Sequence, residues 1–444
     1  MIKAIFNKAN TFFKNKFTNS AIYLLVEKVI RLIGNFIIFS EIAKYLGPSN
    51  FGIYNYSLAV FVILLTIANY GIHSLLVKYL CQKEEQKYDL YLGSAFAIKF
   101  SIGLFCLIFI WCSYPLFFED DIKGQLIFIV CLGLVFQSFS VIECWFEAKV
   151  ENKVVSIIKI IFFLIYAFII ILSIKLGISL VTLCYLYVLE IVLRSIALVI
   201  SYQKSGRNIF NFKIDRTITK DLLKNGLPLL LSSIAGIIYL KIDQIMIGEI
   251  LNDNELGYYS GAVRFAEAIY FVPWIIANAI FPKIIENKNK NIKQHYIEFQ
   301  KFASYFIYSS FFIALFLYSI SYYLILFVLG DDYTASLPIL KIHAWSIIFI
   351  SLRCLVNKWF VLEGMYNKLF LLEIFGGLTN VALNIVLIPY IGISGAAFTS
   401  LFSYALISYF GLLFFKKSRK VFYIFTNSIF NPYYFIISKL QNRD

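Results

Sequence analysis

The chain has 444 residues, of which 60% are hydrophobic and only 15% are charged, and its mean hydropathy is +0.78. No soluble domain of this size has that balance, and the apolar residues fall in runs long enough to cross a bilayer at roughly 20 residues each. The runs are continuous, which excludes a transmembrane β-barrel, because barrel strands alternate apolar and polar residues over about ten positions. The net charge of +14 has to be judged by where it lies.

The apolar runs predict an all-α polytopic membrane protein with about twelve transmembrane helices. In chain order the runs cover residues 20–43, 51–77, 91–113, 124–147, 154–174, 178–202, 227–250, 257–282, 301–328, 336–360, 368–389 and 393–415. The seven cysteines are scattered through or beside these runs without a CxxC pair, so we expect neither disulfides nor a metal site.

Basic and acidic residues lie in opposite sets of loops. The longest loop on the side of the N-terminus contains Lys204, Arg207, Lys213, Arg216, Lys220 and Lys224. The loops on the other side contain Glu119, Asp120, Asp121, Asp253, Asp331 and Asp332. Cytoplasmic loops of membrane proteins carry the excess of Lys and Arg. We therefore expect both termini in the cytoplasm, the lipid bilayer as a partner, and no nucleic-acid partner.

The two halves of the chain share a sequence echo. Residues 46–61 read LGPSNFGIYNYSLAVF and residues 251–265 read LNDNELGYYSGAVRF, with Gly52 aligned on Gly257. A second echo is KLGIS at 175–179 and YIGIS at 390–394. Because each half holds an even number of spans, the repeat is parallel. Two such copies favour a transporter with a site between them that opens to either side in turn.

The longest polar connection, residues 203–226, suggests the division of the chain. We predict an N-lobe of six spans at 1–202, a cytoplasmic linker at 203–226, a C-lobe of six spans at 227–415 and a basic cytoplasmic tail at 416–444. Residues 421–438 of the tail are aromatic but interrupted by polar residues. This predicts a segment that lies on the cytoplasmic leaflet rather than a thirteenth span.

Ionisable residues occur inside several predicted spans. A charge at the bilayer centre costs ~2.5–3.5 kcal/mol, so such residues face a bundle interior or a wet cavity. In the first half they are Glu27, Arg31, Lys99, Glu143, Glu147, Glu190 and Arg194. In the second half they are Lys241, Asp243, Arg264, Glu267, His343 and Arg353. Glu27–Arg31 and Glu190–Arg194 are four residues apart, so each could be a self-neutralising pair that only fixes packing.

Lys99, His343 and Arg353 have no evident partner on their own helix, which favours a cationic cavity. Such a cavity suits a phosphate-bearing substrate, because Arg and Lys replace the water that a pyrophosphate loses with charge-assisted hydrogen bonds. The acids could carry a coupling ion or serve only as counter-ions.

Several motifs resemble the polysaccharide-biosynthesis flippases, the O-antigen type within the multidrug/oligosaccharidyl-lipid/polysaccharide exporter superfamily. The motifs are LGPSNFGIYNYS at 46–57, NGLPLLLSS at 225–233, YLKIDQIMIG at 239–248, LGYYSGAVRFAE at 256–267, FPKI at 281–284 and IPYIGISGAAFTS at 388–400. The resemblance covers nearly the whole chain. It implies a V-shaped, two-lobe fold of twelve helices in the bacterial inner membrane.

The resemblance also implies a function and a site. Such proteins turn an undecaprenyl-diphosphate-linked oligosaccharide, such as an O-antigen unit of lipopolysaccharide or a capsule unit, from the cytoplasmic to the periplasmic leaflet. By position and residue type, the cationic cavity maps to Arg31, Lys99, Lys241, Arg264 and Arg353. Candidate coupling groups or counter-ions are Glu27, Glu190, Asp243, Glu267 and His343.

We therefore expect a lipid-linked oligosaccharide flippase that works by alternating access, is not an enzyme and has no bound cofactor. Coupling to protons or sodium ions and a glycan polymerase as partner remain open. The nearest alternative is a multidrug cation exporter of the same superfamily, whose cavity should be acidic. A membrane glycan polymerase or ligase is a further alternative, but the chain has short outer loops and no HExxH, DxD or GxSxG motif.

Overall fold

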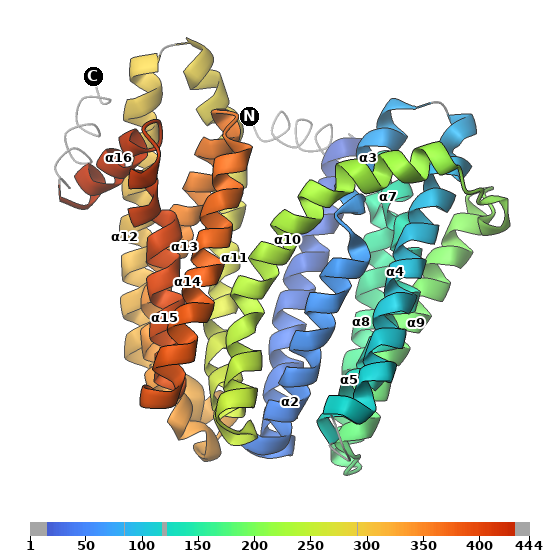
Figure 1. Cartoon of the computed structure of the whole chain (residues 1–444), viewed down its shortest axis with the longest axis horizontal. Coiled ribbons are helices and arrows are strands. Elements are labelled where there is room, and N and C mark those ends of the chain that lie inside the picture. The colour runs from blue at the N-terminus through green and yellow to red at the C-terminus, as the bar shows by residue number, and fades with distance from the viewer. Residues whose placement is uncertain (1–15, 84, 118–121, 291, 431–444) are drawn as a thin grey trace, which may run out of the picture. The chain divides into compact units, whose positions relative to one another are not determined.

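The computed structural model describes residues 16–83, 85–117, 122–290 and 292–430, and every regular element within these ranges is helical (Figure 1). Eleven helices of the described chain are long and apolar enough to cross a membrane. One of them, Ile22–Gln82, has 61 residues and covers the second predicted run and all but the first two residues of the first. The prediction of an all-α polytopic protein is confirmed.

The described residues form two compact units. Unit 1 contains the chain up to Leu46 and the segment Ile53–Ile237, and unit 2 contains Gly47–Gly52 and the chain from Ile238 onward. The division thus lies within one helix, α10 (Arg216–Ile250), whereas the sequence suggested residues 203–226. The lobe boundaries drawn from the sequence stay predictions.

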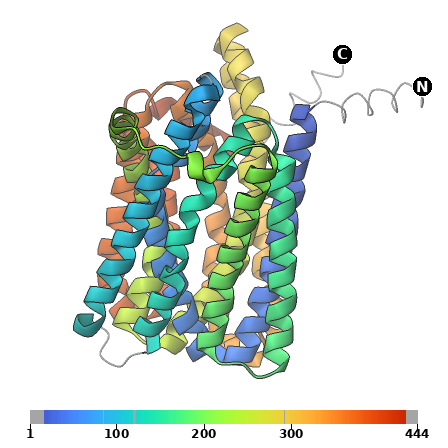
Figure 2. The same ribbon diagram turned by 90° about the vertical axis from the view of Figure 1, so that its right-hand side faces the viewer.

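Unit 1 is a helical bundle whose long members run side by side (Figure 2). It contains most of α2 (Lys16–Asn69), α3 (Ile72–Gln82), α4 (Tyr88–Phe117), α5 (Ile122–Cys131), α6 (Gly133–Phe136), η2 (Gln137–Ser140), α7 (Val141–Ala148), α8 (Asn152–Lys175), α9 (Leu180–Lys204), η3 (Ile209–Asn211) and the start of α10. Its core includes Leu80, Leu92, Phe146 and Tyr202, all fully buried.

The polar connection after α9 is part of unit 1 and packs against α4. Lys213 N donates to the Asp89 carbonyl at 3.2 Å, and a Cβ on Gly93 would meet the backbone of Lys213. The Asp215 carboxylate accepts from Ile218 N at 2.8 Å, a side-chain cap that starts α10. These backbone contacts explain why the connection belongs to a compact unit, which the polar composition alone did not indicate.

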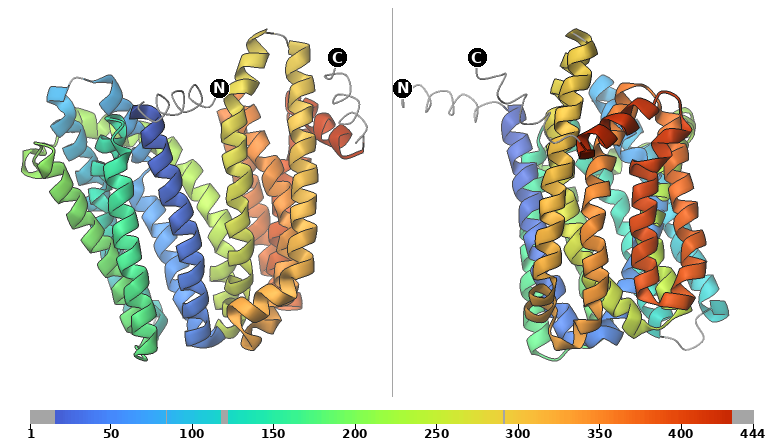
Figure 3. Two further views of the ribbon diagram at one scale, coloured as in Figure 1. Left: turned by 180° about the vertical axis from the view of Figure 1, so that it is seen from behind. Right: turned by 90° about the vertical axis from the view of Figure 1, so that its left-hand side faces the viewer.

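Unit 2 is built around one central helix. It contains the rest of α10, α11 (Asp253–Lys290), α12 (Ile292–Leu324), η4 (Ile325–Leu329), η5 (Asp331–Ser336), α13 (Leu337–Leu362), α14 (Tyr366–Ile391), α15 (Ile393–Ser408), η6 (Phe410–Phe414) and α16 (Arg419–Phe430). Helix α13 packs against α11, α12 and α15 (Figure 3, right). Its Trp359 and Phe360 are buried in the core.

The chain turns sharply between η6 and α16. The buried Ser418 hydroxyl donates to the carbonyls of Leu412 at 2.7 Å and Phe415 at 3.0 Å. Helix α16 then packs on α12 through Val421 and Phe425. The predicted surface segment at 421–438 is therefore helical as far as Phe430, and the remainder lies outside the described residues.

The two copies of the sequence echo meet each other inside unit 2. A Cβ on Gly52 would overlap the carbonyl oxygen of Asp253, and a Cβ on Gly257 would overlap that of Pro48. The two contacts are equivalent under the Gly52–Gly257 alignment, because Pro48 then aligns with Asp253. Two backbones can approach this closely only where both residues lack a side chain. The echo therefore marks a reciprocal packing contact.

We predict that Gly52→Ala and Gly257→Ala each lower the melting temperature of the detergent-purified protein, because overpacking against a backbone costs about 1–3 kcal/mol or more. Gly236→Ala, in α10, is the matched control, since its Cβ would meet no atom within 4 Å. Melting followed by size-exclusion chromatography measures all three. Equal melting temperatures for the three variants would contradict the reciprocal contact.

Candidate functional site

A break in the second predicted span opens a site in unit 1. Helix α2 ends at Asn69, and Tyr70 (φ 51°) and Gly71 (φ 65°) are left-handed before α3 begins at Ile72. A Cβ on Gly71 would lie 2.6 Å from Leu229 Cβ of α10, so this break is packed against a helix. Irregular backbone within a membrane occurs where it is buried or lines a cavity. The break therefore points to a functional position.

The fourth predicted span is also irregular. It changes from α-helix to a 3₁₀ turn at Gln137–Ser140 and back to α-helix at Val141. The Ser140 hydroxyl donates to the Gln137 carbonyl at 2.6 Å, which satisfies one group that the tighter turn frees. Short 3₁₀ stretches inside a longer helix often mark functional positions.

Both irregular segments border one polar cavity of about 540 Å³. Its lining is Thr66, Asn69, Gly71, His73 and Ser74 around the break, Lys99 of α4, Gln137, Ser140 and Glu143 of the fourth span, Arg194 of α9, and Leu229, Ser232 and Ser233 of α10. All but two of these residues are polar. The volume lies in the range of about 300–1,000 Å³ that is usual for small-molecule sites.

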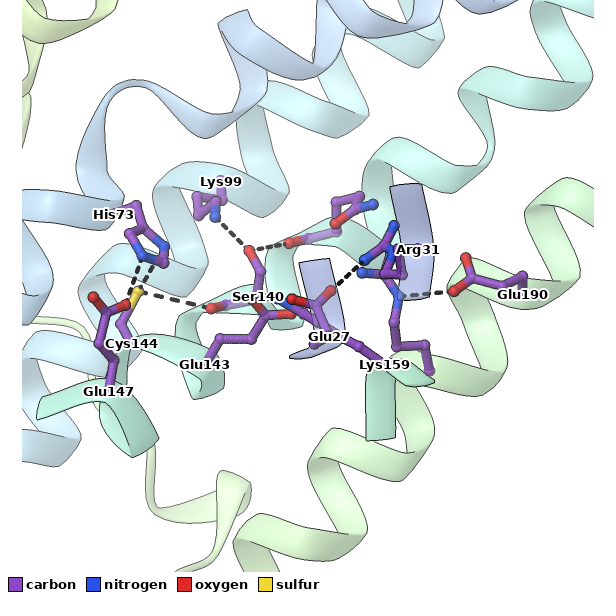
Figure 4. A network of polar contacts seen from close by, with 12 residues as sticks. Glu27, Arg31, His73, Lys99, Ser140, Glu143, Cys144, Glu147, Lys159 and Glu190 are labelled. Carbon is purple, nitrogen blue, oxygen red and sulfur yellow. Dashed lines mark hydrogen bonds and ion pairs between the residues drawn. The ribbon is translucent and has the colours of Figure 1, made fainter. Parts of the chain in front are cut away.

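Lys99 provides a cation in the cavity wall. Its side chain comes from α4, and only 3% of the residue is exposed. Its ammonium donates to Ser140 Oγ at 2.5 Å, and within the described chain it forms no ion pair (Figure 4). An ammonium carries three donors, so Lys99 keeps capacity for a ligand in the cavity.

The other charges around Lys99 are neutralised in pairs (Figure 4). The ion pairs are Glu143–Lys159 at 2.7 Å, Glu190–Arg194 at 3.2 Å and Glu27–Arg31 at 3.3 Å. The two pairs expected from their spacing of four residues are therefore formed. Arg31, one of the five predicted cavity cations, is absent from the lining of this cavity and also lies over the ring of Phe163.

The sequence reasoning missed His73. Its Nε2 lies 2.9 Å from Glu147 Oε2, and its Nδ1 lies 3.3 Å from Cys144 Sγ (Figure 4). The sequence analysis named Glu147 among the charges inside the spans, but its partner His73 lies on α3, beyond the break. A histidine inside an apolar run, two residues after a glycine, was the available signal.

A buried acidic centre lies in unit 2. Asp243 of α10 is 3% exposed, and its carboxylate accepts from Tyr259 Oη at 2.7 Å, Asn384 Nδ2 at 2.6 Å and the Ser400 hydroxyl. These partners are neutral, and no cation pairs with Asp243 within the described residues. Asn384 Oδ1 and the hydroxyl of Thr399 are buried without a hydrogen-bond partner in the described chain. We name these residues the Asp243 cluster.

The predicted cations of unit 2, Lys241, Arg264 and Arg353, form ion pairs with glutamates. Glu267 lies 3.0 Å from Lys241 and 3.8 Å from Arg264, so one carboxylate serves two cations. Arg353 holds Glu373 of α14 through two hydrogen bonds, one from Nε to Oε1 at 3.2 Å and one from Nη2 to Oε2. The sequence analysis did not single out Glu373. Arg353 and Glu373 lie on different helices, so no fixed separation in the sequence identifies them as partners.

His343 is a packing residue in the structure. It is 2% exposed, its ring stands edge-on to Tyr259 at 5.7 Å, and neither ring nitrogen has a hydrogen-bond partner within the described chain. This geometry places His343 in the interface between α11 and α13, and its role as a coupling group or counter-ion stays a prediction. The convergence of the five predicted cations on one passage stays a prediction, because Lys99 alone among them lines the cavity of unit 1.

Lys99 and Asp243 differ from the other buried charged residues in having no ion-pair partner among the described residues. Among described Asp, Glu, Lys and Arg residues, the buried ones are Glu27, Lys99, Asp243 and Glu373. Glu27 and Glu373 pair with arginines, whereas Lys99 and Asp243 have only neutral partners. An unpaired buried charge is costly to retain, so these two positions are the strongest candidates for ligands of opposite charge.

We predict that Glu373→Gln lowers the free energy of unfolding by about 3–5 kcal/mol, because it leaves Arg353 without its counter-charge. The double variant Arg353→Met, Glu373→Leu removes both charges and should recover most of the loss. Thermal unfolding in detergent compares the three proteins. A single variant as stable as the unchanged protein would contradict a structural role for the pair.

Solved structures with the same fold are transporters. Lipid II flippase MurJ in an inward closed conformation matches with a TM-score of 0.71 at 17% identity, over 95% of each chain. An inward-facing multidrug resistance MATE family transporter of the MOP superfamily matches with a TM-score of 0.68 at 16% identity, over 92% of this chain and 99% of that one.

A third structure is a MOP superfamily transporter from Pyrococcus furiosus, which is described as having a binding pocket of reverse polarity. It matches with a TM-score of 0.61 at 15% identity, over 93% of this chain and 96% of the other. No curated protein sequence matches the chain. The sequence profile of the family named polysaccharide biosynthesis protein matches residues 17–288, more than half of the chain. The chain belongs to the polysaccharide biosynthesis protein family, and the described residues contain eleven helices that are long and apolar enough to cross a membrane.

Proposed function

We propose that the protein flips an undecaprenyl-diphosphate-linked oligosaccharide, of the O-antigen or capsule type, across the bacterial inner membrane by alternating access. Both termini lie in the cytoplasm, and the glycan headgroup travels from there to the periplasmic leaflet. A glycan polymerase that consumes the flipped unit is the expected partner. The family match and the shared fold support a flippase-type transporter.

The polar cavity of unit 1 is the observation that carries the choice of substrate. Its lining offers hydroxyl and amide groups from Thr66, Asn69, Gln137, Ser232 and Ser233, which suit the hydroxyls of a sugar. The same cavity contains the buried cation Lys99. A headgroup that joins sugars to a diphosphate needs both kinds of partner.

The charge balance of this cavity favours an anion. Glu143 and Arg194 also line it, but each is paired with a residue of opposite charge, which leaves Lys99 as the unmatched charge of the lining among described residues. A phosphate oxygen bound to Lys99 would form a charge-assisted hydrogen bond. It would also supply the counter-charge that the folded protein does not provide.

The Asp243 cluster supports ion coupling in unit 2. A buried carboxylate surrounded by neutral donors, beside the unpartnered oxygens of Asn384 and Thr399, can take up a proton or a sodium ion. Binding of that cation would match the charge of Asp243. A conformational change that opens the cluster to alternate faces would then couple ion entry to substrate export.

The two rival functions differ in the charge or groups they need. A multidrug cation exporter shares the fold, but its ligands are cations, and the unmatched charge in the cavity of unit 1 is positive. A glycan polymerase or ligase needs a catalytic group at a membrane face. The cavity groups described above bind or orient a headgroup and need no chemical step.

We predict that Lys99→Gln lowers transport at least about tenfold, because one charge-assisted hydrogen bond contributes about 1.5–3 kcal/mol. The assay follows an undecaprenyl-diphosphate-linked oligosaccharide in proteoliposomes, with accessibility of the glycan to an added enzyme as the readout. Lys220→Gln, an exposed cytoplasmic-side lysine, removes the same charge as the matched control. Lys99→Arg should retain most of the transport.

Equal transport by the Lys99→Gln and Lys220→Gln proteins would contradict the assignment of the headgroup to this cavity. Absence of transport by the unchanged protein, with and without an ion gradient, would contradict the flippase function itself. Resistance of expressing cells to cationic drugs would instead favour the multidrug exporter.

We predict that Asp243→Asn abolishes the response of transport to proton or sodium gradients. The amide keeps the shape of the carboxylate but has no charge for a cation to match. Transport in proteoliposomes is measured with each gradient imposed separately and with none. A variant that still responds to a gradient like the unchanged protein would contradict coupling at the Asp243 cluster.

A further inference from the structure

An apolar groove lies on the surface of unit 2, between α14 and η6. It has a volume of about 470 Å³ and is lined by one face of α14 over residues 371–378 together with Phe414 and Phe415. Phe375 and Phe414, which both line it, meet edge-to-face with ring centroids 5.5 Å apart. Leu378, at its rim, is 65% exposed. In a bilayer this surface would face hydrocarbon.

One end of the groove is strongly basic. Lys368, in the first turn of α14, places its Nζ 5.5 Å from the ring centroid of Phe415, which lines the groove. Lys416 and Lys417 follow Phe415 directly and are exposed. Arg419 lies beside them, with its Nε donating to the Leu413 carbonyl at 2.9 Å. We name Lys368, Lys416 and Lys417 the basic rim.

We propose that this groove binds an anionic glycerophospholipid, with its phosphate on the basic rim and one acyl chain along α14. The apolar groove would then contact the acyl chain, and the basic rim at its end would contact the phosphate. Basic pockets at the cytoplasmic ends of membrane helices bind anionic headgroups by this combination. The sequence predicts that the basic rim is on the cytoplasmic side.

The length of the groove along α14 fits a lipid of one leaflet. Residues 371–378 cover about 10 Å of helix α14 at 1.5 Å per residue. One leaflet provides about half of the ~30 Å hydrocarbon thickness. The groove therefore accommodates part of an acyl chain that is anchored at one surface. This site belongs to unit 2 and is separate from the headgroup cavity of unit 1, so it does not depend on the proposed substrate.

Native mass spectrometry of the full-length protein in detergent tests this site with phosphatidylglycerol and phosphatidylcholine as probes. We expect phosphatidylglycerol to bind at least about tenfold more tightly, and this preference to vanish when Lys368, Lys416 and Lys417 are all changed to Gln. The matched control changes Lys204, Lys220 and Lys224 to Gln, and it should keep the preference. Phe414→Ser should weaken binding of phosphatidylglycerol, since it places a hydroxyl in the apolar lining of the groove.

Three results would overturn the proposal. Equal binding of the two lipids by the unchanged protein would remove the anionic preference. Equal loss in the rim and control variants, at matched melting temperatures, would show that net charge rather than this site attracts the lipid. Displacement of phosphatidylglycerol by undecaprenyl phosphate in the unchanged protein but not in the rim variant would assign the groove to the carrier lipid.

Discussion

The need to match every buried charge is the constraint that organises this molecule. In hydrocarbon an unpaired ion is costly, and of the four buried Asp, Glu, Lys and Arg residues of the described chain, Glu27 and Glu373 are paired with arginines of their own unit. Two described positions depart from that rule, Lys99 in unit 1 and Asp243 in unit 2. In the proposed function, Lys99 binds the anionic headgroup and Asp243 binds the coupling cation.

Irregular backbone gives the polar cavity its form. A continuous helix through residues 66–74 would present its polar side chains on several faces, whereas the break at Tyr70 and Gly71 turns them toward Lys99. The break is maintained by α10, because Leu229 packs where any other residue at position 71 would place a Cβ. The absence of a Cβ likewise allows Gly52 and Gly257 to pack backbone against backbone in unit 2.

The amino-acid sequence was sufficient for the fold but only partly for the site. Apolar length predicted the spans, and residue spacing predicted the Glu27–Arg31 and Glu190–Arg194 pairs, because a helix brings residues four apart together. Partners on different helices, such as Glu373 for Arg353 and His73 for Glu147, follow from packing that spacing does not encode. The sequence likewise did not show that the two echoes contact each other.

The central claim is that the glycan diphosphate enters the cavity beside Lys99. A photo-crosslinking amino acid at Ser233, which lines that cavity, tests it directly with a radiolabelled undecaprenyl-diphosphate-linked oligosaccharide. The same amino acid at Leu189, an exposed apolar position of α9, serves as the reference. The account predicts a labelled adduct at position 233 that disappears when Lys99 is changed to Gln. An adduct at position 189 of equal yield, or one at 233 that is indifferent to Lys99, would contradict it.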